Sequence, residues 1–553
     1  MKRYGLLSTL ALIALIVLPL FFAQAETEDD LELPDLVLYS ENTSAPTSNS
    51  QGDDADWGDV PAIIFENMQP TSTFSGNNPP VLREDVLTEE ERGDLDYDPC
   101  VFNNKVVKRS AISAIEFVDH LDDIGNDAWD VSMAEDGSVW AWTRDEANGK
   151  RLFIAGNGGV TAPGNCSHLF ARYENLEEIR FNNCFFTGET TNMHQMFGRC
   201  RSLAHLDVTC FDTRNVTDFS YMFSKCERLT DLDVQGFDTS AADTMQGMFS
   251  NCASLESIDV SGFNTANVTD MSHLFSDCSR LTGIDVSNFD TGNVSDMNHM
   301  FNGCSALTAI DLRSFDTSKV ERMNYMFYEC ANVRKLDVSR FDTGNVINMS
   351  HMFSKCSSLS VLETSRFNTS RVESMNDMFN NCGSLESVDV SHFDTGRVTD
   401  MYRMFNRCKR LKRVDASGFN TCKVTNASKM FSNCTNLEQL DVSDRFILLN
   451  RKELNTENMF ASCHAKVVRD GQAMSASDWI GQASIKPDMA KGDTGHSVRW
   501  LQRVLIQLGY LSGQADGIWG DETEEGLKRF QSASGLGETG RADEETIEAL
   551  CNR

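Results

Sequence analysis

The chain has 553 residues, with 82 Asp and Glu against 49 Lys and Arg, so its formal net charge is −33. This charge excludes a general nucleic-acid binder and a protein drawn to anionic membranes, because the summed field repels polyanions. We therefore expect no nucleic-acid partner. With 41% apolar residues the chain can bury cores, and its length predicts several domains. Its 17 cysteines fit neither a small disulfide scaffold nor a typical cytosolic enzyme.

Residues 1–25 have the layout of a secretory signal peptide. Lys2 and Arg3 precede an apolar run over residues 10–23, and small residues follow at the expected cleavage point. The alternative is an uncleaved membrane anchor, because the segment is nearly long enough to span a bilayer core. We predict an extracellular protein of the cell wall or cell surface, which contacts the membrane only if this segment is uncleaved.

Residues 26–98 hold 20 acidic residues and two basic ones, and few aromatic residues. This composition predicts an acidic, disordered spacer, with a specific binding tail as the alternative. Residues 99–164 alternate between apolar and polar, and Asn148-Gly149 separates two apolar runs. That pattern predicts a β-hairpin within a small β-rich N-terminal cap.

A 26-residue repeat dominates residues 165–468. Phe followed by Asp or Asn and then Thr recurs at every step from Phe211 to Phe419, and Cys recurs from Cys200 to Cys434. A fixed period of this length indicates a solenoid, in which each turn buries its apolar face against its neighbours. The Leu-Asp-Val triplets alternate as a short strand does, and the apolar residues between Val268 and Cys278 fall on one helical face.

The predicted fold is an α/β repeat solenoid of the leucine-rich-repeat kind, with one strand plus one short helix per 26-residue turn. A β-rich cap precedes the solenoid and a three-helix module follows it. The unit from Ile258 to Cys278 resembles the 26-residue repeat of the BspA-like leucine-rich-repeat surface proteins of bacteria. This resemblance implies an exported or wall-associated protein that serves adhesion and protein contacts, and it does not imply catalysis.

The cysteine column allows two interpretations. Eleven of the cysteines, Cys200 to Cys434 in 26-residue steps and then Cys463, share one repeat position. They are expected to be buried thiols, with a ladder of disulfides as the alternative. Outside the column, Cys184 and Cys210 form the best disulfide candidate. The cysteines left for redox chemistry are Cys100, Cys166, Cys184, Cys210, Cys422 and Cys551.

An acidic column runs along the outer face of the predicted sheet, because its members lie between inward-facing apolar residues. Its members are Asp207, Asp233, Asp259, Asp285, Asp311, Asp337, Glu363, Asp389, Asp415 and Asp441. Like charges about 5 Å apart repel, so the column needs compensation. The functional hypothesis is a strip that binds a protein or host-surface ligand and could also hold calcium. The interpretation that we favour over it is a ladder whose carboxylates accept hydrogen bonds from neighbouring Ser, Thr or backbone amides.

Residues 490–553 are predicted to be helical and to follow a linker over residues 469–489. Leu508-Gly509-Tyr510, Asp516-Gly517-Ile518-Trp519-Gly520 and Phe530-Gln531 resemble the three-helix peptidoglycan-binding module. The resemblance implies noncovalent attachment to the wall, with peptidoglycan as partner. Most matching residues are expected to form the fold. The residues expected to contact the glycan are Trp500, Tyr510, Asp516, Trp519 and Arg529.

Nothing in the sequence assigns catalysis, so we expect no enzyme, no catalytic residue, no metal and no cofactor. His273, His299 and His351 share a repeat position, which fits repeated polar positions better than a metal site. The function expected is an exported surface protein, noncovalently tethered to peptidoglycan, that presents its repeats for protein binding or adhesion. The alternatives are a purely architectural wall protein and a wall hydrolase with an unrecognised catalytic region.

Overall fold

The computed structural model describes residues 78–85, 87–88, 91 and 97–553. The chain divides into two units, Met1–Gln69 and Pro70–Arg553, and every described residue belongs to the second. The predicted signal segment and most of the predicted spacer lie outside the described residues. Within the part that the structure describes, no helix has the length and apolar composition required to cross a membrane.

A five-stranded sheet forms the predicted N-terminal cap. Its spatial order is β2 (Trp129–Asp130), β3 (Val139–Glu146), β4 (Gly149–Gly156), β1 (Ile112–Val118) and β6 (Glu178–Arg180), and η1 (Val101–Asn103) and η2 (Arg109–Ala111) precede it. β3 and β4 form the predicted hairpin, in which Glu146 pairs with Gly149. β1 lies between β4 and β6 and is parallel to both. The cap sheet therefore continues into the first repeat turn through β6.

Part of the predicted spacer belongs to this cap. Val81 bridges to Thr161, and the side chain of Leu82 is fully buried. The carboxylate of Asp85 lies 2.8 Å from the guanidinium of Arg109. The prediction of a disordered spacer up to residue 98 is therefore wrong for this part. Composition could not show that these few residues find buried partners far along the chain.

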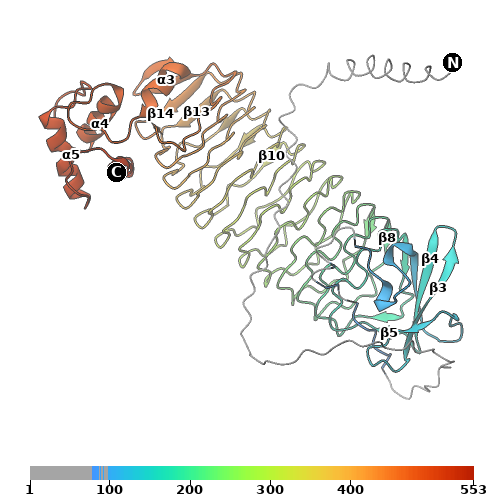
Figure 1. Cartoon of the computed structure of the whole chain (residues 1–553). Coiled ribbons are helices and arrows are strands. Elements are labelled where there is room, and N and C mark those ends of the chain that lie inside the picture. The colour runs from blue at the N-terminus through green and yellow to red at the C-terminus, as the bar shows by residue number, and fades with distance from the viewer. Residues whose placement is uncertain (1–77, 86, 89–90, 92–96) are drawn as a thin grey trace, which may run out of the picture. The chain divides into compact units, whose positions relative to one another are not determined.

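The 26-residue turns stack on one another through two parallel ladders (Figure 1). One ladder consists of single bridges that step by 26 residues from Asn192 to Asn426 and end at Asn455. The other consists of short parallel strands at the Leu-Asp-Val triplets and at the equivalent position of the last turn, and it is divided into three separate sheets. These strands are β8 (His205–Leu206), β9 (Asp231–Leu232), β10 (Lys335–Leu336), β11 (Val361–Leu362), β12 (Ser387–Val388), β13 (Arg413–Ala416), β14 (Gln439–Val442) and β16 (Lys466–Arg469). At the N-terminal end, β5 (Val160–Thr161) pairs with β7 (Phe185–Phe186).

The short helix predicted in each turn is absent from residues 119–475, all of which the structure describes. The N–H groups of Met271, His273 and Phe275 donate to carbonyl oxygens of the next turn at 2.9–3.1 Å. The N–H of Leu274, between them, donates to the carbonyl of Met271 three residues earlier. The φ of His273 is 56°, a value that interrupts a helix. The prediction of a helix is therefore wrong, because overlapping turns produce the same three-residue apolar spacing.

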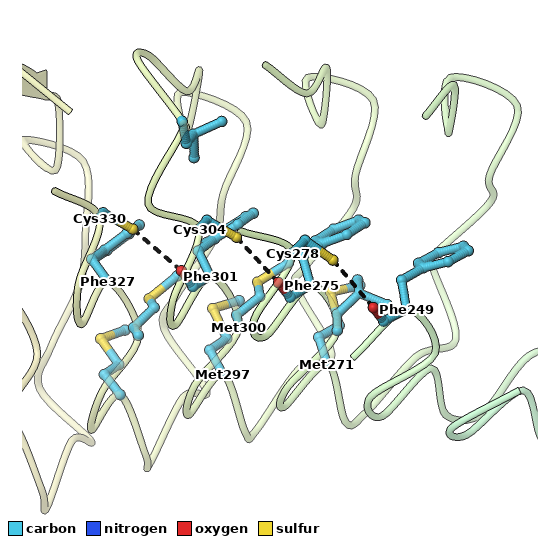
Figure 2. Close-up of a cluster of buried hydrophobic side chains, with 14 of the residues drawn as sticks. Phe249, Met271, Phe275, Cys278, Met297, Met300, Phe301, Cys304, Phe327 and Cys330 are labelled. Carbon is cyan, nitrogen blue, oxygen red and sulfur yellow. Dashed lines mark hydrogen bonds between the residues drawn. The ribbon is translucent and has the colours of Figure 1, made fainter. Parts of the chain in front are cut away.

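The core of the stack is built from columns of equivalent side chains. The Phe rings of successive turns stack, as in Phe249 to Phe275 at 5.6 Å and Phe275 to Phe301 at 5.8 Å between ring centroids (Figure 2). The Thr of each Phe-Asp-Thr turn is buried as well. Thr265, for example, accepts the N–H of Asp290 and donates to its carbonyl. Each turn thus satisfies the buried Thr hydroxyl of its neighbour, and this pairing favours a fixed period.

The C-terminal part begins with structure where a linker was predicted. Within residues 469–489, β17 (Gln472–Ser475) is antiparallel to β16, and it is followed by α3 (Ala476–Ala483) and β18 (Ser484–Ile485). β18 pairs with β15 (Leu448–Leu449) of the last repeat region. The linker prediction is therefore corrected, because the segment extends the repeat sheet and covers its end. The three predicted helices follow as α4 (His496–Gln507), α5 (Asp521–Ala533) and α6 (Glu544–Cys551).

Candidate functional site

A buried glutamine on α4 organises the first loop of the C-terminal module. The Nε2 of Gln502 donates to Oδ1 of Asp516 at 2.8 Å, to the carbonyl of Ile518 at 3.1 Å and to Oγ1 of Thr523 at 3.2 Å. Its Oε1 accepts the N–H of Gly517 at 2.7 Å. Gln502 is only 3% exposed, so it holds the loop against the start of α5 rather than facing a ligand.

A second glutamine repeats this arrangement on α5. The Nε2 of Gln531 donates to Oγ1 of Thr539, to the carbonyl of Arg541 and to Oγ1 of Thr546, and its Oε1 accepts the N–H of Gly540. The equivalence of the two glutamines was not predicted. The available signal was that each follows an apolar helical residue and precedes a Gly and then a Thr. Both networks confirm that these matching residues form the fold.

Two of the five residues expected to contact the glycan are buried. Trp500 is 1% exposed and Trp519 is 2% exposed, so the prediction that they present a glycan-binding surface is wrong. The indole N–H of Trp500 donates to the carbonyl of Asp444 at 2.8 Å, in the region that joins the repeats to the module. Both rings belong to the apolar core of the module. The sequence placed the module after a linker, and it therefore gave no reason to expect the repeats to cover one of its faces.

The other three predicted residues retain accessible surface. Asp516 and Arg529 are exposed and Tyr510 is half-buried. Arg529 donates to the carbonyl of Tyr510 at 2.6 Å, which brings these two together. The backbone N–H of Ile518 donates to Asp516 and holds the pKa of that carboxyl below its usual value. Ile518, beside Asp516, is an apolar side chain that is 59% exposed, which was not predicted.

The module is joined to the repeats covalently and by polar contacts. Cys422 of the repeats forms a disulfide with Cys551 at the end of α6. The Nδ2 of Asn420 donates to the carbonyl of Cys551 at 3.1 Å. Asp444 accepts from Arg503 of α4 at 2.7 Å. This pairing was not predicted, although Cys422 and Cys551 both lie outside the cysteine column, which was the available signal.

The column cysteines are buried thiols, as expected. Ten of them, Cys200 to Cys434 in 26-residue steps, point their Sγ at the carbonyl oxygen of a Phe in the preceding turn at 3.0–3.3 Å. Figure 2 shows three of these bonds, from Cys278, Cys304 and Cys330. Burial raises the pKa of Cys278 to about 12, so this thiol stays neutral. Cys184 and Cys210 are both free, so our best disulfide candidate was wrong.

The acidic column lies on the surface, and its carboxylates are held by local hydrogen bonds. Seven of its ten members are exposed and Asp311, Asp415 and Asp441 are half-buried. Eight of the aspartates accept the backbone N–H of the residue two positions later, at 2.9–3.2 Å. Hydrogen bonds from Ser287 hold the pKa of Asp285 below its usual value. This matches the hydrogen-bonded ladder, the interpretation that the sequence favours. The binding strip stays a prediction.

The histidines that share a repeat position form a stack of rings. His273 lies over His299 at 4.3 Å between centroids, His299 over Tyr325 at 4.5 Å, and Tyr325 over His351 at 4.2 Å. Burial lowers the pKa of His299 to about 3 and that of His351 to about 4. These rings are therefore neutral at pH 7. Among the described residues, no group of three or more His, Cys, Asp or Glu side chains is arranged to hold a metal ion.

The repeats and the C-terminal module each match a known protein family. Residues 164–283, 247–364 and 360–469 each match the family described as "Mycoplasma protein of unknown function, DUF285", and together they cover more than half of the chain. Residues 494–550 match the family described as "Putative peptidoglycan binding domain". No curated protein matches the chain. The chain therefore belongs to the DUF285 family and carries a C-terminal domain of the peptidoglycan-binding kind.

Proposed function

We propose that the chain is an exported cell-surface protein that is tethered noncovalently to peptidoglycan and presents its repeat solenoid for protein binding or adhesion. The match of residues 494–550 to a peptidoglycan-binding domain is the observation that carries the proposal. The secretory layout of residues 1–25 and the resemblance of the repeats to BspA-like leucine-rich repeats support the location and the role of the solenoid.

The presence of a disulfide and the burial of the column cysteines support export. Disulfides persist in oxidising compartments, and the bond between Cys422 and Cys551 would be stable there. Free thiols are a liability in the same compartments, because the thiolate is the species that is oxidised. Burial and a raised pKa protect the column cysteines, such as Cys278, from that reaction.

The attachment of the module supports the presentation role. The disulfide and the contact of Trp500 with Asp444 hold the module against the end of the repeats. A wall polymer bound to the module would therefore anchor the repeats directly. The exposed acidic column then offers a negatively charged strip along successive turns, suited to a basic protein partner.

The proposal assigns no catalytic activity to the chain. A catalytic thiol is exposed and has a lowered pKa, whereas the buried thiols have a raised pKa. The histidines beside Tyr325 stack on its ring and are not hydrogen-bonded to a nucleophile in the described residues. A purely architectural wall protein would be tethered to peptidoglycan in the same way. It would differ from the proposed surface protein because its repeats would bind no partner.

Expression of the full chain with a C-terminal tag in a walled bacterium tests the proposal. We expect the chain in the wall fraction, digestion of the repeats by protease added to intact cells, and release by denaturant without enzymatic cleavage of the wall. Retention in the cytoplasm would contradict export, and resistance to denaturant would contradict a noncovalent tether. Release of soluble fragments from purified peptidoglycan by the chain would instead indicate a hydrolase.

A further inference from the structure

A cavity of about 620 Å³ lies where the last repeat turns meet the end of the C-terminal module. Four cationic side chains line it: Arg371, Arg397, Lys423 and Arg445. Cys551 and the residue after it form the wall on the module side. This concentration of positive charge is unexpected in a chain with a net charge of −33, so it needs a physical explanation.

Three of these cations occupy one repeat position that has a different role in most earlier turns. In four of those turns the position holds an Asn whose Nδ2 donates to a carbonyl of the preceding turn at 2.7–2.9 Å: Asn215, Asn267, Asn293 and Asn345. In the other two it holds an Ala and a Lys, and Lys319 donates to the Asn one turn back at 2.6 Å. Arg371 reaches back to Asn345 instead, at 2.7 Å. Arg397 and Lys423 give up this structural hydrogen bond altogether. The change of residue type therefore adds charge at the expense of a bond that links the turns.

Three of the four cations have no ion-pair partner among the described residues. For the side chains of Arg397, Lys423 and Arg445, no hydrogen bond or ion pair joins them to any other residue in the part of the chain that the structure describes. One acidic side chain, Asp394, lines the cavity, and its Oδ1 accepts the N–H of Gly396 at 3.0 Å. Neighbouring like charges repel, and bound anions would relieve that repulsion.

We propose that this cavity binds the carboxylate groups of peptidoglycan stem peptides and so forms a second contact with the polymer that the module holds. The inference rests on the proposed tether. Arg binds carboxylates through paired, charge-assisted hydrogen bonds, and the volume is within the range of small-ligand sites. The polymer is the available anion, because residues at the end of the module form one wall of the cavity. Two linked contacts raise the avidity for one polymer.

The test compares two triple variants of the full chain that change charge equally. The cavity variant carries Arg397→Gln, Lys423→Gln and Arg445→Gln. The control carries Arg228→Gln, Arg334→Gln and Lys409→Gln, three exposed cations whose side chains, within the described residues, make no bond either. Fluorescence anisotropy measures the binding of a labelled, soluble muropeptide, with its carboxylates either free or amidated. Equal unfolding temperatures establish that both variants are folded.

We expect the cavity variant to bind the free muropeptide about tenfold more weakly than the wild type does, whereas the control binds it equally well. Amidation of the muropeptide should weaken wild-type binding to the level of the cavity variant. Equal affinity of the wild type and the cavity variant for the free muropeptide would overturn the inference. Equal affinity of the wild type for the free and the amidated muropeptide would also overturn it. So would displacement of the labelled muropeptide by a phosphate polymer but not by unlabelled muropeptide. Sedimentation of the wild type with insoluble peptidoglycan reports separately on the tether, so a failure of the proposed function can be distinguished from a failure of this site.

Discussion

Cys422 in the repeats and Cys551 at the end of α6 form a disulfide across a sequence separation of 129 residues. The bond encloses the last turns and the module in one covalent loop. Replacing both with Ser should lower the free energy of unfolding of the module by about 2–4 kcal/mol, because the unfolded chain loses a constraint. Differential scanning calorimetry of the double variant measures this loss. Cys100→Ser, which removes a free and half-buried thiol, should leave the transition unchanged. An unchanged transition in the double variant would show that the bond does not form.

Substitution of a single cysteine of the column should lower the free energy of unfolding of the repeats. The Sγ of Cys304 donates to the carbonyl of Phe275 at 3.1 Å, and the same carbonyl accepts the N–H of Cys278 at 3.2 Å. Cys304→Ala therefore removes one of the two donors to this buried carbonyl and leaves a small void. We expect a loss of about 1–3 kcal/mol in the free energy of unfolding. Cys304→Ser keeps a donor and should lose less. The midpoints of denaturant unfolding of the Ala and Ser variants measure this difference. An equal loss of free energy of unfolding in both variants would mean that the hydrogen bond does not contribute to stability.

The sequence predicted the period, the buried Cys and Phe columns and the helical module, because a repeated position must meet the same surroundings in every turn. It did not distinguish a helix from overlapping turns, since both place Met271 and Leu274 on one face. The burial of Trp500 was missed because it depends on Asp444, in a part of the chain that we had assigned to a separate domain. The disulfide joins positions whose separation follows no repeat, and the cationic cavity appears only when the turns are stacked.

The stacked histidines make the repeats sensitive to acid. Burial lowers the pKa of His299 to about 3, whereas the unfolded side chain titrates near 6.5. Between these values only the unfolded chain takes up the proton. The stability present above pH 6.5 is therefore lost as the pH falls toward 3. His299→Asn removes this titration and tolerates the φ of 56°. The unfolding temperature should fall less steeply from pH 7 to pH 4 in the variant than in the wild type. If the unfolding temperatures of the two proteins fall equally with pH, the titration of His299 does not cause the acid sensitivity.

The N-terminal end of the stack depends on a buried ion pair. Arg109 is fully buried, lies 2.8 Å from Asp85 and donates to the carbonyls of His168 and Ala171 in the first turn. Arg109→Ala leaves the Asp85 charge and both carbonyls without this donor, and we expect a loss of about 3–5 kcal/mol.

A matched control separates this ion pair from an exposed one. Arg180 pairs with Glu178 at 2.6 Å, but both side chains are largely accessible to water. Arg180→Ala should therefore cost at most about 1 kcal/mol. Urea unfolding of both variants measures the difference, and a comparable cost at the two positions would show that Arg109 does not cap the stack.

Sedimentation of the full chain with increasing amounts of insoluble peptidoglycan tests the central claim most directly, with chitin as the uncharged glycan control. The peptidoglycan-tether account predicts saturable pelleting with peptidoglycan, displacement by soluble peptidoglycan fragments and no pelleting with chitin. A chain that stays in the supernatant at every peptidoglycan concentration, or that pellets equally with chitin, would contradict it.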